Sequence, residues 1–251
     1  MMLLSVGVLA YGIGIAFLGA AYLALTPSNL GMVSDLSHSS DWIRLIAAMI
    51  ALVAVATAGK QVYQLGENLR DAVVTVIAAL LIVLGLLVEA AAGETLTATG
   101  VITGLGITVA SLPVFARDER AAGAGIVLLA IGYAMSASAT STGAAVAAGL
   151  LEAAGTVVIT YSVAALVHPG GYLRAAPGKP LWLRTLMAGL LLLIMGFIAQ
   201  AFVSGVIYSG NASLTAIRTG PAVAYLLQFL GFAMLAAAVW VWLLHLSSRP
   251  R

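Results

Sequence analysis

The sequence predicts an all-α protein of the membrane: a polytopic bundle of eight transmembrane helices. Its 251 residues are 62% hydrophobic and only 8% charged, and the mean hydropathy is +1.11. A soluble domain has about 45–50% apolar and about 25% charged residues. Nine acids and eleven bases are too few to cover a 25.5 kDa globule in water, so a soluble enzyme is excluded. Disorder is excluded as well, because disordered chains have low hydrophobicity.

Eight apolar stretches mark the expected helices. A bilayer core of about 30 Å requires about 20 apolar helical residues. The second stretch is short, with Trp42 expected at an interface and Arg44 expected to extend toward the headgroups. We expect the polar residues 27–41 before it to form a loop, and residues 122–167 to form two helices because they exceed one bilayer crossing. The expected helices span 3–25, 43–59, 72–92, 98–116, 122–140, 143–167, 185–208 and 221–245.

The basic residues give an independent test of this count and predict the orientation. With eight spans, nine of the eleven Lys and Arg residues fall in the segments on one side. The cytoplasmic side of a membrane protein carries this excess. We therefore expect a multi-pass protein of the cell membrane with both termini in the cytoplasm. The nine are Lys60, Arg70, Arg117, Arg120, Arg174, Lys179, Arg184, Arg249 and Arg251.

Several kinds of chemistry are missing from the sequence. There are no cysteines, which excludes thiolate metal sites and iron–sulfur ligation. The three histidines, His38, His168 and His245, fall in loops or terminal turns, so we expect no haem and no cofactor of the protein's own. No nucleophile–base pair and no phosphate loop is visible, and the net charge of +2 is too small to indicate nucleic acid. The chain is therefore expected to have no catalytic site of its own.

A short glycine pattern recurs along the chain. Glycines seven residues apart occur at Gly7 and Gly14, at Gly125 and Gly132, and at Gly189 and Gly196, with a weaker version from Ala78 to Gly85. Seven residues are close to two helical turns, so each pair lies on one helix face. Two even-numbered spans share a second pattern, Glu152 to Gly155 and Gln228 to Gly231, which is faint at residues 102–106 and absent from 43–59.

The pattern has three interpretations. It indicates a duplicated helical hairpin, or two parallel four-helix halves at 1–120 and 121–251 of a single transmembrane domain. Alternatively, glycines that allow close helix packing explain it without duplication.

Polar residues follow the glycines and indicate a site. Glu89, Ser136 and Gln200 come four residues after a glycine of the pattern, on the same helix face. The expected topology brings them to the outer half of the membrane, together with polar residues of the even-numbered spans. An ionised carboxylate in lipid costs about 2.5–3.5 kcal/mol, so such residues normally face the bundle interior. We expect Glu89 to reach the interface and Glu152 to be the stronger candidate. The expected ligand or proton pocket contains Glu152, Glu89, Gln200, Gln228, Ser136, Thr103 and Tyr225.

Two functions fit these observations. The first is a non-catalytic subunit of a larger membrane complex, such as a respiratory electron-transfer complex, with a quinone or lipid in the outer-leaflet pocket. Its partners would be membrane lipid and other subunits that carry the redox centres. The alternative is a small proton- or cation-coupled secondary transporter or channel. Against the alternative stands a thin polar lining. No aspartate, lysine, arginine or asparagine is expected deep in a span, and the inner half of the membrane region is almost wholly apolar. The remaining hypotheses are a membrane enzyme that acts on lipid or polyprenyl substrates, for which no catalytic motif is visible, and a structural role without a small ligand.

Overall fold

The computed structural model is all-helical in the residues that it describes, which are 2–26, 28–64, 69–92, 97–116, 119–167, 181–210 and 212–247. Within these ranges the chain forms eight helices and no strand. The helices are α1 (Met2–Ala24), α2 (Leu30–Gln64), α3 (Leu69–Ala92), α4 (Thr97–Ala116), α5 (Arg120–Ser138), α6 (Thr142–Val167), α7 (Leu181–Tyr208) and α8 (Leu214–Ser247).

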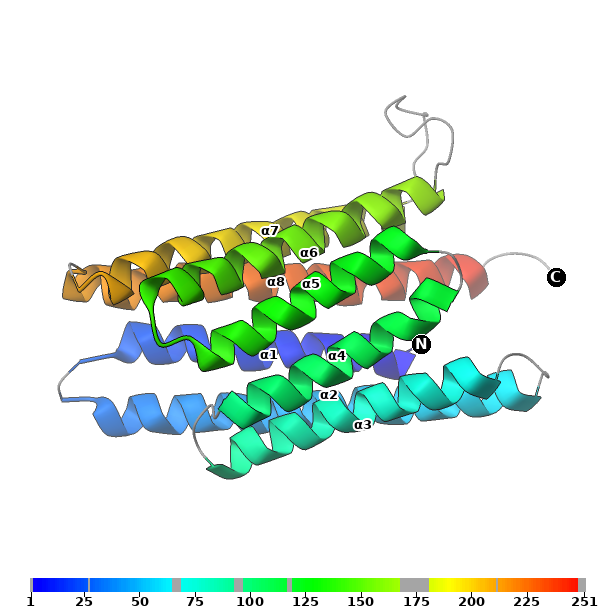
Figure 1. Ribbon diagram of the computed structural model, residues 1–251, viewed down its shortest axis with the longest axis horizontal. Helices are drawn as coiled ribbons and strands as arrows, with labels where there is room; N and C mark the ends of the chain where they lie inside the picture. Colours follow the sequence, from blue (N-terminus) through cyan, green and yellow to red (C-terminus); the bar gives the residue numbers. More distant parts are fainter. Residues whose placement is uncertain are drawn as a thin grey trace.

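The helices are arranged as a closed ring. Each helix packs against the one before it and the one after it, and α8 packs against α1. In the described parts of the chain no other pair of helices is in contact. Most of the connections are short, so successive helices run in opposite directions (Figure 1). The ring therefore has an interior that all eight helices can line.

The outer surface of the ring is that of a membrane protein. Each of the eight helices is long and apolar enough to cross a membrane, the shortest apolar segments being the 19-residue Thr97–Phe115 and Arg120–Ser138. Large apolar side chains are exposed along the bundle, and Phe202 is 73% exposed. Helices satisfy their backbone hydrogen bonds internally, as lipid requires. The predicted fold class, a polytopic bundle of transmembrane helices, is confirmed.

The two ends of the bundle differ in the number of basic residues that the structure describes there. Helix α1 begins and α8 ends at the same end, which we call the terminal end, and the opposite end is the distal end (Figure 1). Arg70, Arg120 and Arg184 lie exposed in the first turns of α3, α5 and α7, at the terminal end. Arg218 lies at the distal end, where its Nη2 donates a hydrogen bond to the backbone oxygen of Leu23 at 2.7 Å. The alternation of basic residues thus follows the helix directions.

One prediction about local structure was wrong. Residues 27–41 do not form a long loop, because α2 begins at Leu30 and has 35 residues. Arg44 consequently lies inside the bundle with 6% of its surface exposed, and not at an interface. The reason is that the polar residues Ser37, Asp41 and Arg44 follow one another at four- and three-residue steps, which places them on one helix face. Averaged hydropathy does not detect such a face.

The ring consists of four helical hairpins, α1–α2, α3–α4, α5–α6 and α7–α8, which pack in the same way. A Cβ added to Gly132 on α5 would lie 2.7 Å from Cγ of Glu152 and 2.8 Å from the backbone oxygen of Ala148 on α6. Gly196 has the same relation to Gln228 and Ala224. The equivalent pairs of glycine and overlying side chain are Gly14 with Arg44, Gly85 with Thr103, Gly132 with Glu152, and Gly196 with Gln228.

The packing extends the second sequence pattern, that of Glu152 to Gly155 and Gln228 to Gly231, to helix α2, where the sequence did not reveal it. The first position of the glycine pattern, seven residues before the second, packs in a repeated way as well. The facing pairs there are Gly7 with Ala47, Ala78 with Gly106, Gly125 with Gly155, and Gly189 with Gly231. Ala47 of α2 thus replaces the glycine that follows Glu152 and Gln228 by three residues. Duplication of a hairpin, or of halves 1–120 and 121–251, stays a prediction.

Candidate functional site

The ring encloses a cavity of about 810 Å³ to which all eight helices contribute. Pockets for small organic ligands have volumes of about 300–1,000 Å³. The cavity reaches the distal end of the bundle, where it is lined by Leu25, Val33 and Ala139, which lie at or near the ends of α1, α2 and α5. Tyr11 and Phe232 line it at its deeper side. The cavity therefore lies in the distal half of the ring.

The glycine pattern decides which side chains face this cavity. On each odd-numbered helix, the residues three before, one after and four after the second glycine line the cavity. These three positions share one helix face, and the glycine itself sits against the neighbouring helix. The twelve residues are Tyr11, Ile15, Leu18, Ile82, Leu86, Glu89, Leu129, Tyr133, Ser136, Leu193, Phe197 and Gln200.

The even-numbered helices contribute the side chains that lie over those glycines. Arg44, Thr103, Glu152 and Gln228 all line the cavity, one from each hairpin. All seven residues of the expected pocket are therefore brought to one cavity: Glu152, Glu89, Gln200, Gln228, Ser136, Thr103 and Tyr225. Ligand binding by these residues remains a hypothesis. Glu89 does not extend to an interface as expected, since only 3% of its surface is exposed.

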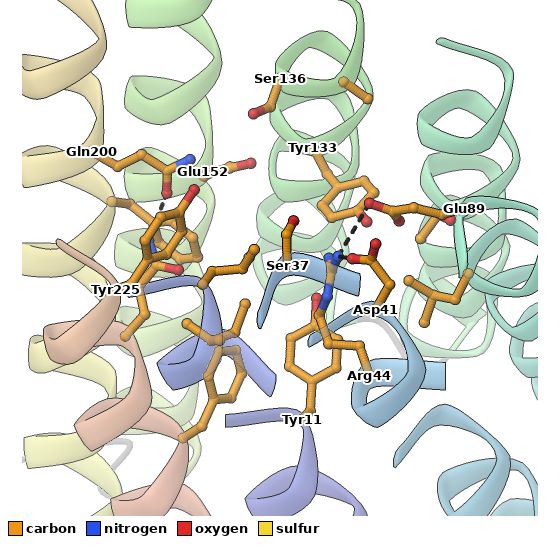
Figure 2. Close-up of a pocket in the computed structure, with 18 of the residues that line it drawn as sticks. Tyr11, Ser37, Asp41, Arg44, Glu89, Tyr133, Ser136, Glu152, Gln200 and Tyr225 are labelled. Atoms are coloured by element: carbon orange, nitrogen blue, oxygen red, sulfur yellow. Dashed lines mark hydrogen bonds and ion pairs between the residues drawn. The ribbon is translucent and has the colours of Figure 1, made fainter. Parts of the chain in front are cut away.

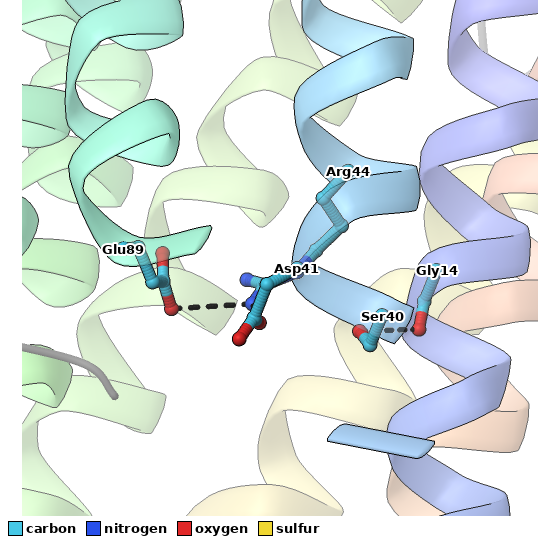
Figure 3. Close-up of polar contacts among 5 residues, drawn as sticks. All are labelled: Gly14, Ser40, Asp41, Arg44 and Glu89. Atoms are coloured by element: carbon cyan, nitrogen blue, oxygen red, sulfur yellow. Dashed lines mark hydrogen bonds and ion pairs between the residues drawn. The ribbon is translucent and has the colours of Figure 1, made fainter. Parts of the chain in front are cut away.

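One side of the cavity carries a group of ion pairs, which we call the ion-pair wall: Asp41 and Arg44 from α2 and Glu89 from α3 (Figure 3). Nη2 of Arg44 donates to Oδ1 of Asp41 and, at 3.1 Å, to Oε1 of Glu89. Beside it, Oγ of Ser40 donates to the backbone oxygen of Gly14 at 2.7 Å and connects α2 to α1. Removing one partner of a buried ion pair leaves an uncompensated charge, so these residues depend on one another.

The opposite side differs in its chemistry, with Glu152 from α6, Gln200 from α7 and Tyr225 from α8 (Figure 2). Together with Gln228 of α8, which is hydrogen-bonded to Gln200, these residues are called here the carboxyl–amide wall. Nε2 of Gln228 donates to Oε1 of Gln200 at 2.6 Å. Glu152 is only 4% exposed, yet its carboxylate has no ion pair or hydrogen bond among the described residues. A buried carboxylate without a counter-charge is costly in a membrane protein, which makes Glu152 a candidate for a functional role.

Aromatic rings also line the cavity. Tyr22 and Tyr225 stack with their ring centroids 5.8 Å apart, and Tyr11 meets Phe232 edge-on at 5.2 Å. Both pairs join α1 to α8. Tyr133 of α5 reaches into the cavity between the walls (Figure 2). The cavity is thus amphipathic, with charged and amide groups on two sides and ring faces between them.

Two polar atoms of the lining are buried without a hydrogen-bond partner in the described structure. They are Nε of Arg44 and Oγ1 of Thr103. Burying a polar group without a hydrogen bond is unfavourable, and water or a ligand normally satisfies such atoms. Water or a polar ligand group inside the cavity would satisfy both atoms.

The sequence analysis missed Asp41 and Arg44, which are the most consequential residues of the ion-pair wall. Two signals could have found them. The first is the one-sided spacing of Ser37, Asp41 and Arg44. The second is the hairpin repeat, in which Arg44 precedes Ala47 as Glu152 precedes Gly155. Ala47 hid the repeat because it stands where the later hairpins have glycine.

The histidines offer no second site in the parts of the chain that can be described. His38 lies on an exposed face of α2, where its Nε2 accepts a hydrogen bond from Nε1 of Trp42 at 2.8 Å. His168 and the side chain of His245 lie outside the described residues.

Comparison with known proteins adds no function to this geometry. No protein-family model, no curated protein and no solved structure matches the chain. The site is therefore interpreted from its own residues.

Proposed function

We propose that this protein is a small secondary transporter that couples the movement of a solute to protons or cations. The observation that carries the proposal is the cavity inside the ring, made by this chain alone and containing the buried carboxylate of Glu152. Ionisable groups inside membrane proteins usually belong to substrate sites or proton pathways. A carboxylate that can hold either a proton or a cation provides the coupling.

The strongest objection to a transporter was the absence of aspartate and arginine from the membrane interior. For the distal half of the membrane that objection no longer stands, because Asp41 and Arg44 both line the cavity there. Secondary transporters bind their substrates near the middle of the bilayer, between structural repeats. The equivalent packing of the four hairpins supports such an arrangement, since hairpins that pack alike can rearrange against one another around a central site.

The orientation follows from the charges. The excess of basic residues at the terminal end supports a cytoplasmic location of both termini in the cell membrane. The distal end, which the cavity reaches, would then face the outside. The cavity would accept its solute from that side in the conformation described.

Reconstituted vesicles test the proposal. Purified protein is placed in liposomes, a pH difference is imposed, and uptake is measured for a set of radiolabelled solutes that covers cations, zwitterions, anions and neutral molecules. We expect one charge class to accumulate under the pH difference, and Glu152→Gln to abolish that accumulation. Uptake equal to that of protein-free liposomes for every solute would refute a transporter.

Glu119→Gln is the matched control for this experiment. Glu119 lies just before α5, at the terminal end of the bundle, and is not part of the cavity lining. The same chemical change there should leave transport unaltered.

A subunit with a quinone or lipid pocket is the second candidate. The amphipathic lining favours it, since ring faces and apolar side chains such as Ile82, Leu129 and Leu193 adjoin the polar walls. Organic extraction of protein purified in mild detergent would identify a bound quinone. Co-purification of a redox protein together with a quinone would favour this candidate over the transporter.

A further inference from the structure

We propose that the cavity binds a monovalent organic cation, with its charged group at Glu152 and its apolar body among the tyrosine and phenylalanine rings. The proposal names the substrate class of the proposed transporter and rests on that function for the movement of the cation. The binding itself depends only on the cavity.

The charge balance of the lining is the first argument. Three carboxylates, those of Asp41, Glu89 and Glu152, face one guanidinium, that of Arg44, among the lining residues. Arg44 is already engaged by two of the carboxylates. In their charged forms these groups leave an excess of negative charge in a space with little water, which favours a cation and disfavours an anion.

The position of the excess charge is the second argument. On the ion-pair wall, positive and negative groups neutralise each other at contact distance. On the carboxyl–amide wall, Glu152 lies near Gln200 and Tyr225, neither of which carries a positive charge (Figure 2), and no described residue forms an ion pair with it. A ligand with one positive charge would supply the counter-charge that the protein does not.

The surroundings of Glu152 indicate an organic cation and not a bare metal ion. Hard metal cations need about six oxygen ligands close together. Here one carboxylate adjoins two amides that are hydrogen-bonded to each other. The remaining lining near the centre consists largely of aromatic and aliphatic groups, including Tyr133, Tyr225 and Phe197. Aromatic faces attract organic cations by cation–π interaction, and a volume of about 810 Å³ accommodates a bulky one.

Binding of two ions of the same shape and opposite charge tests the proposal. The probes are tetraphenylphosphonium, a cation, and tetraphenylborate, an anion. The full-length protein in detergent micelles is brought to equilibrium with each labelled ion by dialysis, and protein-free micelles provide the correction for partitioning. We expect saturable binding of one phosphonium ion per protein and no saturable binding of borate.

Variants of Glu152 locate the charge. Glu152→Gln should weaken phosphonium binding by about tenfold or more, because it removes the counter-charge and keeps the shape. Glu152→Asp keeps the charge and should bind within about threefold of the original protein, which guards against a variant that is inactive because it is misfolded. Glu119→Gln, far from the cavity, should bind as the original protein does.

Variants of Tyr225 test the aromatic contribution. Tyr225→Phe keeps the ring face and should retain binding. Tyr225→Leu should weaken phosphonium binding by about twofold to thirtyfold, the range of cation–π interactions.

The outcomes separate this inference from the proposed function. Binding of borate as tight as that of phosphonium, or unaltered phosphonium binding by Glu152→Gln, would overturn the cation assignment while leaving a transporter of another solute tenable. Phosphonium binding that depends on Glu152, without flux in proteoliposomes, would support the cation site and refute transport.

Discussion

The two walls of the cavity are built on the same helix packing but differ in how their charged groups are paired. Arg44 and Glu152 occupy equivalent positions in the first and third hairpins, each lying over a glycine of the preceding helix. Arg44 is engaged by two carboxylates, whereas Glu152 has no charged partner in the described structure. A repeated scaffold therefore carries a neutralised group on one side and an unneutralised one on the other.

The second and fourth hairpins show a milder form of the same contrast. Glu89 and Gln200 are equivalent, four residues after their glycines, and differ in little but charge. Glu89 contacts Arg44, and Gln200 accepts a hydrogen bond from Gln228. We infer that the ion-pair wall mainly stabilises the ring, whereas the carboxyl–amide wall is the side proposed to bind the cation.

Removing Arg44 should have the largest effect on stability. Arg44→Met leaves Asp41 and Glu89 buried without their counter-charge, and we expect the free energy of unfolding to fall by about 3–5 kcal/mol. Denaturant unfolding of the purified protein in detergent measures it. Glu152→Gln, at the equivalent position, should leave stability unchanged or raise it. Equal losses in the two variants would contradict the division between the walls.

Filling the glycine under Glu152 should have the next largest effect. In Gly132→Ala the new Cβ would meet backbone atoms of α6 as close as 2.8 Å, so the helices must separate. We expect a loss of about 1–3 kcal/mol and a displaced Glu152. Gly143, on α6, has no atom within 4 Å of the equivalent Cβ. Gly143→Ala is the control and should unfold at the same temperature or slightly above, and a destabilisation similar to that of Gly132→Ala would refute the packing argument.

The amide pair should contribute less. Gln200→Leu removes the acceptor of the 2.6 Å hydrogen bond from Gln228, and hydrogen bonds between membrane helices contribute about 0.6–1.7 kcal/mol. Unfolding of Gln200→Leu, Gln228→Leu and the double variant measures the coupling. Losses that simply add would show that the two amides do not interact.

The smallest effect is expected where the first hairpin differs from the third and fourth. Ser40 donates to Gly14, whereas Ala148 and Ala224 occupy the equivalent positions. Ser40→Ala should cost about 0.5–1.5 kcal/mol and leave phosphonium binding unaltered. Loss of binding would mean that the ion-pair wall also contacts the ligand.

Much of the fold was predictable because it depends on local apolar content. The apolar stretch 3–25 corresponds to α1 at Met2–Ala24, and 72–92 falls within α3 at Leu69–Ala92. The start of α2 was not predictable in this way, because its first turns carry Ser37 and Asp41 toward the cavity and resemble a polar loop when hydropathy is averaged. The candidate site was largely predictable because glycine spacing and helix direction together give each polar residue a face and a depth.

The sequence by itself determined that this is a bundle of eight membrane helices, and it predicted a pocket of seven polar residues within the bundle. It determined this because apolar length, basic-residue alternation and the helical repeat are properties of single segments. Only the tertiary structure decided that the helices close into a ring and that Arg44 lies opposite Glu152. It also decided that Arg44 has carboxylate partners, whereas Glu152 has no charged partner among the described residues. Whether a buried charge is compensated depends on which helix lies beside it, and that relation arises only when distant segments pack together.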